Sequence, residues 1–188
     1  AGWDTVPLGG GGFVTGMACN SNASALYCRT DVGGAFRWVP ALDGSNGSWV
    51  SLTDDMLVFG TPLASTLMQV DSFVTDPSNL NRVYMAAGNG IWVSDDQGEN
   101  WTDAGDPNIA TSGNATYKTC GERIAVDPNN PDIVWFGSRT TGLHKGVKQL
   151  DGTWVWTTVP DTSIPFGRTG STAKAGVSFL ACDKIGRR

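Results

Sequence analysis

Apolar and polar residues alternate over short runs along most of the chain, and turn residues separate the runs. Period-two runs of about four to eight residues, bounded by Gly, Asn, Asp and Pro, are typical of β-strands with one buried face. Three segments share this pattern: Phe13 to Trp49, Phe73 to Trp101 and Ile124 to Trp154. Each segment has room for four strands, so the pattern predicts an all-β chain with little helix.

The three segments also align with one another at their first turn. Their strand-and-turn sequences are MACNSNASALYC, FVTDPSNLNRVYMA and IAVDPNNPDIVWFG, which place Tyr27, Tyr84 and Trp135 in equivalent positions. Four-stranded repeats of about 40 to 50 residues are typical of β-propeller blades, because one blade cannot bury both of its faces alone. The repeats therefore predict a β-propeller architecture.

The predicted blades cover about residues 9–53, 70–104 and 121–158, with inner strands near 13–19, 73–76 and 124–127. A fourth blade is expected to start at 176–183, where Asp183 aligns with Asp127 and Asp76. Three blades and one strand do not close a ring, and an open propeller exposes a sheet face and strand edges. Either the rest of the propeller therefore lies elsewhere, or residues 1–188 are a fragment of it. The final Arg187-Arg188 pair resembles a dibasic processing site.

The second segment contains Ser94-Asp95-Asp96-Gln97-Gly98-Glu99-Asn100-Trp101, which matches the S-x-D-x-G-x-x-W pattern of the Asp-box found in sialidase-like propellers. In such a turn Asp96 is expected to accept backbone hydrogen bonds, and Gly98 to adopt positive φ. Trp101 is expected to fill the space between strands. We therefore interpret Asp96 as structural and not catalytic.

Composition excludes several classes of function. The net charge is −5, and the 13 Lys and Arg residues do not cluster as a nucleic-acid partner requires. No apolar run approaches the roughly 18 to 20 residues of a membrane span. His144 is the sole histidine, which excludes a His-pair metal site. We therefore expect no metal, cofactor, nucleic-acid or membrane partner.

Sequons and cysteines indicate a secreted, extracellular protein. Four Asn-x-Ser/Thr sequons predict glycosylation, at Asn22, Asn46, Asn100 and Asn114. Cys19 and Cys28 flank the turn 20–25, and we expect them to form a disulfide across it. Cys120 and Cys182 fall at opposite ends of neighbouring inner strands in the predicted alignment, so we expect no bridge between them.

Several blocks closely resemble the N-terminal half of glycoside hydrolase family 74, in an order that the family also keeps. They run from Trp3 to about Lys145 and comprise residues 9–16, 29–38, 121–128 and 136–139. Members of the family are tandem seven-bladed propellers that cleave xyloglucan or related β-1,4-glucans with inversion, in a cleft between the two propellers. The resemblance implies a secreted hydrolase of plant cell-wall polysaccharide, in which this chain is part of the first seven-bladed propeller and the remainder of the protein completes it.

The resemblance also implies roles for particular residues. The Arg-Thr-Asp-x-Gly-Gly block places the family's general base at Asp31, and Gly33 and Gly34 would let the backbone pass close to a sugar ring. Trp38 is the aromatic subsite candidate, and Arg139 is a further candidate for substrate binding. No residue matches the block that carries the general acid, so that group is expected outside this chain.

Glu122 is the remaining internal carboxylate candidate, although an ion pair with Arg123 or Arg139 is its more ordinary interpretation. The chain departs from the family where Gly88-Asn89-Gly90 turns directly into Ile91, and again over residues 103–119. Two alternatives stay open: a non-catalytic, lectin-like carbohydrate-binding propeller, and a sialidase-like or sortilin-like interaction propeller. The Arg-Thr-Asp-x-Gly-Gly block favours the hydrolase.

Overall fold

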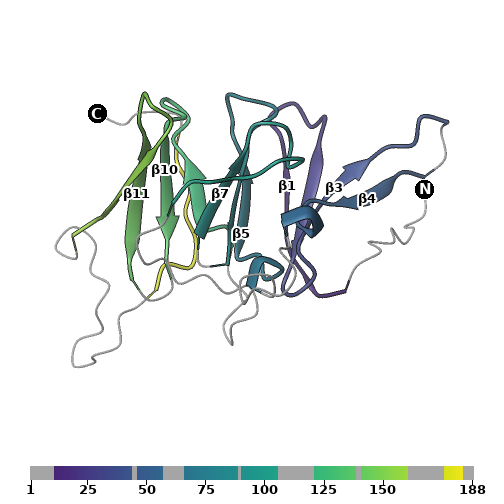
Figure 1. Ribbon diagram of the computed structural model, residues 1–188, viewed down its shortest axis with the longest axis horizontal. Helices are drawn as coiled ribbons and strands as arrows, with labels where there is room; N and C mark the ends of the chain where they lie inside the picture. Colours follow the sequence, from purple (N-terminus) through teal and green to yellow (C-terminus); the bar gives the residue numbers. More distant parts are fainter. Residues whose placement is uncertain are drawn as a thin grey trace.

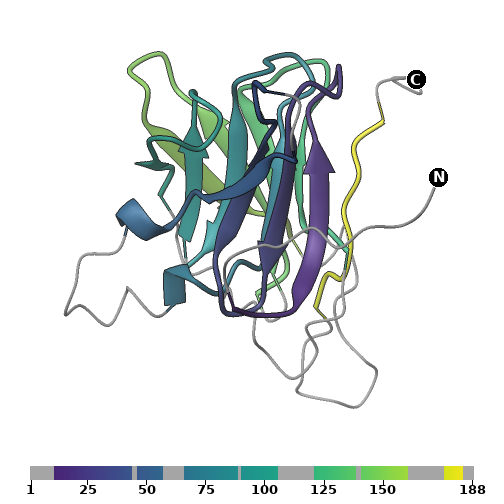
Figure 2. The ribbon, with the colours of Figure 1, turned by 90° about the vertical axis from the view of Figure 1, so that its right-hand side faces the viewer.

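A computed structural model describes residues 11–43, 46–56, 66–88, 90–105, 121–138, 141–160 and 176–183. Within these residues the chain forms twelve strands in three four-stranded sheets, and every strand pairs antiparallel with its neighbour. The sheets stand side by side along the long axis of the molecule (Figure 1). Figure 2 looks onto the first sheet, with the other two behind it. The all-β propeller prediction is confirmed, as an incomplete ring.

Each sheet is an up-and-down meander whose strands keep chain order. Sheet 1 contains β1 (Val14–Cys19), β2 (Leu26–Thr30), β3 (Ala35–Val39) and β4 (Ser48–Ser51). Sheet 2 contains β5 (Ser72–Thr75), β6 (Val83–Ala87), β7 (Gly90–Ser94) and β8 (Thr102–Asp103). Sheet 3 contains β9 (Ile124–Val126), β10 (Ile133–Gly137), β11 (Leu143–Lys148) and β12 (Trp154–Thr158). A short 3-10 helix, η1 (Asp54–Met56), follows β4. The first strands β1, β5 and β9 coincide with the predicted inner strands.

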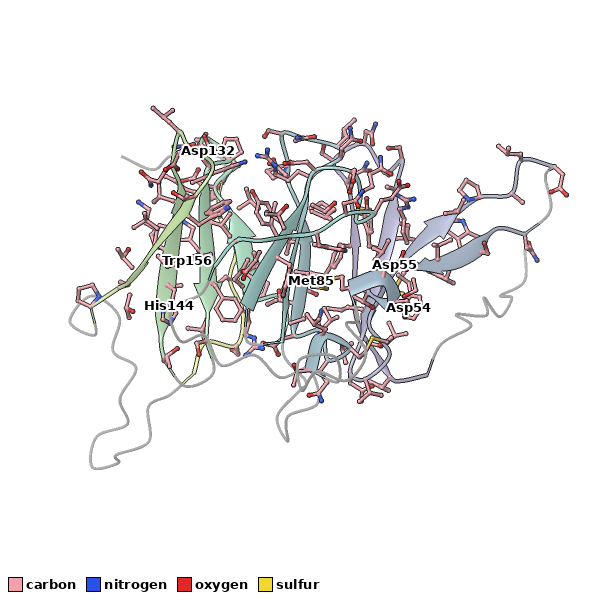
Figure 3. All side chains as sticks on the ribbon, in the orientation of Figure 1. Asp54, Asp55, Met85, Asp132, His144 and Trp156 are labelled. Carbon is pink, nitrogen blue, oxygen red and sulfur yellow. The ribbon has the colours of Figure 1, made fainter. Side chains whose placement is uncertain are left out.

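The alternating pattern buries one apolar layer between each pair of sheets. Tyr27 of sheet 1 packs on Phe73 of sheet 2, with ring centroids 5.1 Å apart, and Trp101 approaches the same Phe73 ring at 6.2 Å. Between sheets 2 and 3, Tyr84 meets Trp154 at 6.1 Å. Figure 3 shows the side chains that fill both layers, with Met85 and Trp156 labelled. The stacking of sheets thus supplies the burial that a single blade lacks.

The three aligned aromatic residues all face the next segment of chain. Tyr27 faces sheet 2 and Tyr84 faces sheet 3. Trp135 instead lines a small cavity with Leu180, Ala181 and Cys182, on the far side of sheet 3. Their equivalent positions in the sequence therefore become equivalent positions in the stack of blades.

Residues 176–183 lie where that alignment would place the inner strand of a fourth blade. The Val177 N–H donates to the Ser138 carbonyl at 3.0 Å, and the Leu180 N–H donates to the Glu122 carbonyl, also at 3.0 Å. The segment, yellow in Figure 1, does not form a strand, although it packs against sheet 3. The fourth blade stays a prediction, and so does the absence of a Cys120–Cys182 bridge, because Cys120 is outside the described residues.

The predicted Cys19–Cys28 disulfide is not present in the structure, where both thiols are free. The reason is the register of the hairpin: Cys19 lies opposite Leu26, and Cys28 lies opposite Met17. The two cysteines are therefore offset by two residues along the strands. Burial raises the pKa of Cys28 to about 11, so this thiol stays protonated at neutral pH.

The Asp-box turn has the structural role predicted for it. Asp96 Oδ1 accepts from the Asn100 N–H at 2.8 Å and from the Ser94 hydroxyl at 2.7 Å, while Oδ2 accepts from Asn100 Nδ2 at 2.7 Å. Gly98 has φ +91°. Trp101 Nε1 donates to the Leu52 carbonyl of the preceding blade at 2.8 Å. The turn therefore ties sheet 2 to sheet 1.

Replacing Asp96 by Ala in the intact protein is expected to cost about 1 kcal/mol of stability and to leave catalysis unchanged. Partial burial opposes ionisation of Asp96, but hydrogen bonds from Asn100 and Ser94 outweigh it and hold the pKa below the ordinary 3.8. Because the folded-state pKa is lowered, this stabilisation is complete above the ordinary value and is lost as the pH falls through the folded-state value. Thermal midpoints of the two proteins should therefore differ at neutral pH and converge in acid; a constant gap would refute this origin.

Candidate active site

Asp31 lies in the turn that joins β2 to β3, and only 6% of its surface is exposed. Its Oδ1 accepts a hydrogen bond from the Phe13 N–H at 2.7 Å. Its own N–H donates to the Phe13 carbonyl at 3.1 Å. The segment that enters β1 therefore holds both the backbone and the carboxylate of Asp31 in one orientation.

Glycines on both sides of Asp31 allow two backbone segments to meet. A Cβ on Gly33 would collide with the Gly11 carbonyl oxygen, and a Cβ on Gly12 would lie 3.0 Å from Asp31 Oδ1. Gly34 has φ +88°, and a Cβ there would collide with the Thr53 hydroxyl. Gly33 and Gly34 are both buried, so packing within the blade already requires them. Their contact with a sugar stays a prediction.

Trp38 does not lie beside Asp31. It stands three residues beyond Ala35 on β3, about 10 Å along the strand. Its ring packs edge-on against Trp49 of β4, with centroids 5.5 Å apart. A Trp38 subsite would therefore lie away from the reacting bond. Arg139, the other substrate-binding candidate, is outside the described residues.

Glu122 pairs with Arg29 and not with Arg123, one of the two partners predicted for it; the other, Arg139, is outside the described residues. Glu122 Oε1 lies 2.8 Å from Arg29 Nε on β2, and its Oε2 accepts from the Ser72 hydroxyl at 2.7 Å and the Phe73 N–H at 2.8 Å. Successive side chains point to opposite sides of an extended segment, which separates Glu122 from Arg123. Hydrogen bonds and the ion pair thus hold both oxygens of Glu122 in place.

Arg123 forms a fully buried ion pair with Asp71, which immediately precedes β5. Both side chains have no exposed surface, and the guanidinium also lies over the Phe136 ring at 6.0 Å. The sequence carries no local signal for this pair, because its members come from different sheets. Together with Glu122, the pair concentrates charge where β5 and β9 meet.

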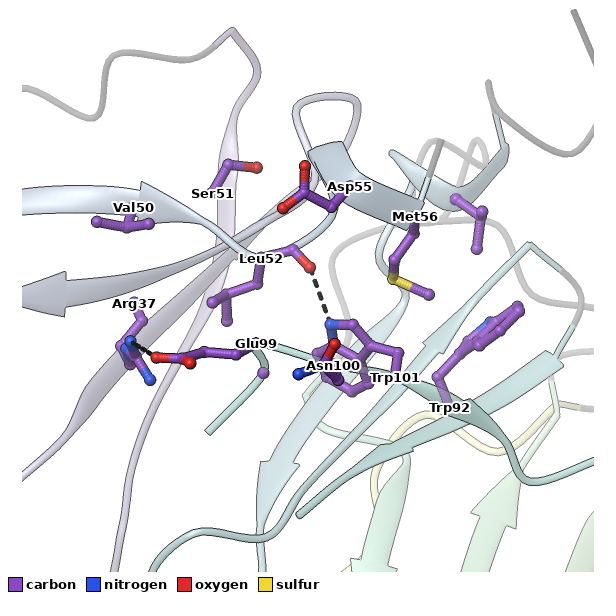
Figure 4. Close-up of a pocket in the computed structure, with 12 residues that line it drawn as sticks. Arg37, Val50, Ser51, Leu52, Asp55, Met56, Trp92, Glu99, Asn100 and Trp101 are labelled. Atoms are coloured by element: carbon purple, nitrogen blue, oxygen red, sulfur yellow. Dashed lines mark hydrogen bonds and ion pairs between the residues drawn. The ribbon is translucent and has the colours of Figure 1, made fainter. Parts of the chain in front are cut away.

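A groove of about 760 Å³ opens between the outer strands of sheets 1 and 2 (Figure 4). Arg37 and Glu99 form an ion pair across it at 3.0 Å. Both of its indoles are tied to backbone carbonyls, Trp101 to Leu52 and Trp92 to Ala87 at 3.0 Å. Asp31 does not line this groove, so it is separate from the candidate catalytic residue.

Neither a membrane-spanning helix nor a cluster of potential metal ligands occurs among the described residues. None of their helices is long and apolar enough to cross a bilayer. In the same part of the chain, no three His, Cys, Asp or Glu side chains gather as a metal ion would require.

Comparison with known proteins identifies the family. A xyloglucanase of Paenibacillus is 36% identical over 97% of this chain. The solved GH74 enzyme of Niastella koreensis is 35% identical over 83% of the chain, with a TM-score of 0.67. The chain belongs to glycoside hydrolase family 74. The GH74 xyloglucanase of Xanthomonas campestris agrees, with 29% identity over 94% of the chain and a TM-score of 0.69. No protein-family model matches the chain.

This family 74 chain spans only part of its relatives. It covers 18% of the Paenibacillus xyloglucanase, 22% of the Niastella enzyme and 25% of the Xanthomonas enzyme. The family resemblance seen in the sequence is confirmed, whereas the activity and substrate named for the relatives belong to those longer proteins.

Proposed function

We propose that the protein carrying this chain hydrolyses xyloglucan or a related β-1,4-glucan with inversion, and that Asp31 is its general base. The observation that carries the proposal is the fixed carboxylate of Asp31, in the turn of the Arg-Thr-Asp-x-Gly-Gly block. A xyloglucanase 36% identical over most of the chain supports the substrate class.

Inverting hydrolysis needs two carboxyl groups about 6.5 to 9.5 Å apart. Asp31 would take a proton from water as the water attacks the anomeric carbon, while a second carboxylic acid protonates the departing glycosidic oxygen. The Phe13 N–H on Oδ1 would orient Asp31 for this transfer. The acid would come from outside these residues, since no residue of the chain matches the family block that carries it.

The proposal includes secretion and glycosylation, since the substrate is a cell-wall polysaccharide outside the cell. Asn22, Asn46 and Asn100 are exposed, as glycan acceptors must be, and Asn114 is outside the described residues. Asn100 already donates to Asp96 through Nδ2, so a glycan there would share that nitrogen with the Asp-box.

Incubating the intact protein with xyloglucan tests the proposal directly. We expect new reducing ends to accumulate with time and the polymer to shorten. Binding of xyloglucan with no release of reducing ends would instead support the lectin-like alternative. Failure both to bind and to cleave it would favour an interaction propeller.

A further inference from the structure

The Glu122 carboxylate joins all three sheets. Glu122 stands just before β9 of sheet 3, and its Oε1 accepts from Arg29 Nε on β2 of sheet 1 at 2.8 Å. Its Oε2 accepts from the Ser72 hydroxyl and the Phe73 N–H on β5 of sheet 2, at 2.7 Å and 2.8 Å. Ser72 Oγ in turn accepts from the Arg123 N–H at 3.0 Å. One side chain thus fixes three blades relative to one another.

The space for this contact depends on a glycine. Gly16 pairs with Arg29 in the β1–β2 register. A Cβ at Gly16 would collide with Glu122 Oε1 and would lie 2.7 Å from Arg29 Nε. The carboxylate and the guanidinium therefore meet directly over the backbone of β1.

Arg29 extends the restraint from Glu122 to β1. Its side chain is only 3% exposed, and its Nη1 donates to the Thr15 hydroxyl at 2.7 Å. Thr15 is the extra residue of a β-bulge, because the register shifts between Val14 and Gly16. A bulge bends its strand and redirects the residues beside it. By binding Thr15, Arg29 therefore stabilises the bulge, and the bulge sets the direction in which the chain enters β1.

The residue at that entry is Phe13, which holds Asp31. The Phe13 N–H donates to Asp31 Oδ1 at 2.7 Å, and the Phe13 carbonyl accepts from the Asp31 N–H at 3.1 Å. Arg29 is also two residues before Asp31 in the chain. Two routes, one through the bulge and one along β2, therefore connect the Glu122 contact to the Asp31 carboxylate.

We propose that Glu122 is a positioning residue for Asp31, acting through Arg29 and the bulge at Thr15. Glu122 neutralises a buried cation and keeps the Phe13 N–H aimed at the carboxylate. The proposal rests on the proposed role of Asp31 as general base. It makes the orientation of the base depend on correct stacking of three blades, because each blade contributes a partner of Glu122.

Glu122→Gln in the intact protein tests the proposal, since it keeps the size of the side chain and removes its charge. We expect kcat on xyloglucan to fall about 10- to 100-fold, because a misplaced catalytic group loses rate. KM should stay within about twofold, because sugar binding is not altered. The matched control is Glu99→Gln, which removes the charge of the exposed Arg37–Glu99 pair between sheets 1 and 2 and should leave kcat unchanged.

A double variant separates this proposal from the proposed function. Asp31→Asn combined with Glu122→Gln should be no slower than Asp31→Asn alone, because Glu122 acts only through the base. An unchanged kcat in Glu122→Gln, or losses that multiply in the double variant, would overturn the positioning role. An active Asp31→Asn variant would instead overturn the role of Asp31 as base.

Arg29→Lys provides a second test that does not depend on the folding of Glu122→Gln. Lysine keeps the positive charge but lacks the planar guanidinium, whose separate N–H groups bind Glu122 and Thr15 at the same time. The expected result is the same fall in kcat at nearly constant KM. A variant with unchanged kcat would contradict the route through Arg29.

Discussion

Asp31→Asn in the intact protein is expected to lower kcat on xyloglucan by about 10²- to 10⁴-fold, the usual cost of removing a general base. The amide keeps the shape of the carboxylate and an oxygen that accepts from the Phe13 N–H, so the turn should survive. Xyloglucan binding should change little, because the carboxylate is not needed to stack sugar rings. Initial rates and equilibrium binding on the same preparation measure both quantities.

Asp132→Asn is the matched control for this prediction. Asp132, labelled in Figure 3, is an exposed residue of the turn before β10, whereas Asp31 follows β2, the equivalent strand of sheet 1. Its amide variant should retain the full rate. Full activity of Asp31→Asn would remove Asp31 from the mechanism and return the chain to the lectin-like interpretation.

Asp71→Asn is expected to cause the largest loss of stability, about 3 to 5 kcal/mol. The cost arises because the change leaves Arg123 charged and fully buried without its carboxylate. Asp95→Asn is the control, since Asp95 pairs with Arg82 at the surface and is 59% exposed, so its loss should cost at most about 1 kcal/mol. Thermal midpoints of both variants measure the difference, and equal small shifts would contradict the account.

Local patterns predicted the strands, the blades and the Asp-box. Alternation placed β1, β5 and β9 correctly, and the alignment of Tyr27 with Tyr84 anticipated their equivalent packing. These features depend on residues close together in the chain, which act through strand periodicity and turn chemistry.

The partners of buried charges could not be predicted in the same way. Arg29 and Glu122 come from different blades, as do Asp71 and Arg123, so only the stacking of sheets brings each pair together. In the sequence, Arg123 is adjacent to Glu122 and was one predicted partner for an ion pair. In an extended backbone, however, adjacent side chains point to opposite sides. A buried arginine needs a carboxylate, yet the sequence does not say which one.

The error at Cys19 and Cys28 has a different origin, the register of one hairpin. Because Cys19 and Cys28 stand on either side of the turn 20–25, the sequence suggested that their thiols would face each other. In the structure, Cys19 lies opposite Leu26. A turn can be recognised from its residues, but its pairing register depends on the loop conformation, which includes Ala23 at φ +58°. Spacing alone therefore did not define the disulfide.

Chemical rescue of Asp31→Ala by azide tests the central claim most directly. Azide needs no base, so it should attack the anomeric carbon from the face that water uses, as the acid protonates the leaving oxygen. We predict that azide restores turnover in this variant and yields a glycosyl azide of inverted, α configuration, identified by proton NMR. A variant that needs no azide to cleave xyloglucan, or a product that retains the β configuration, would contradict the assignment of Asp31 as the base of an inverting hydrolase.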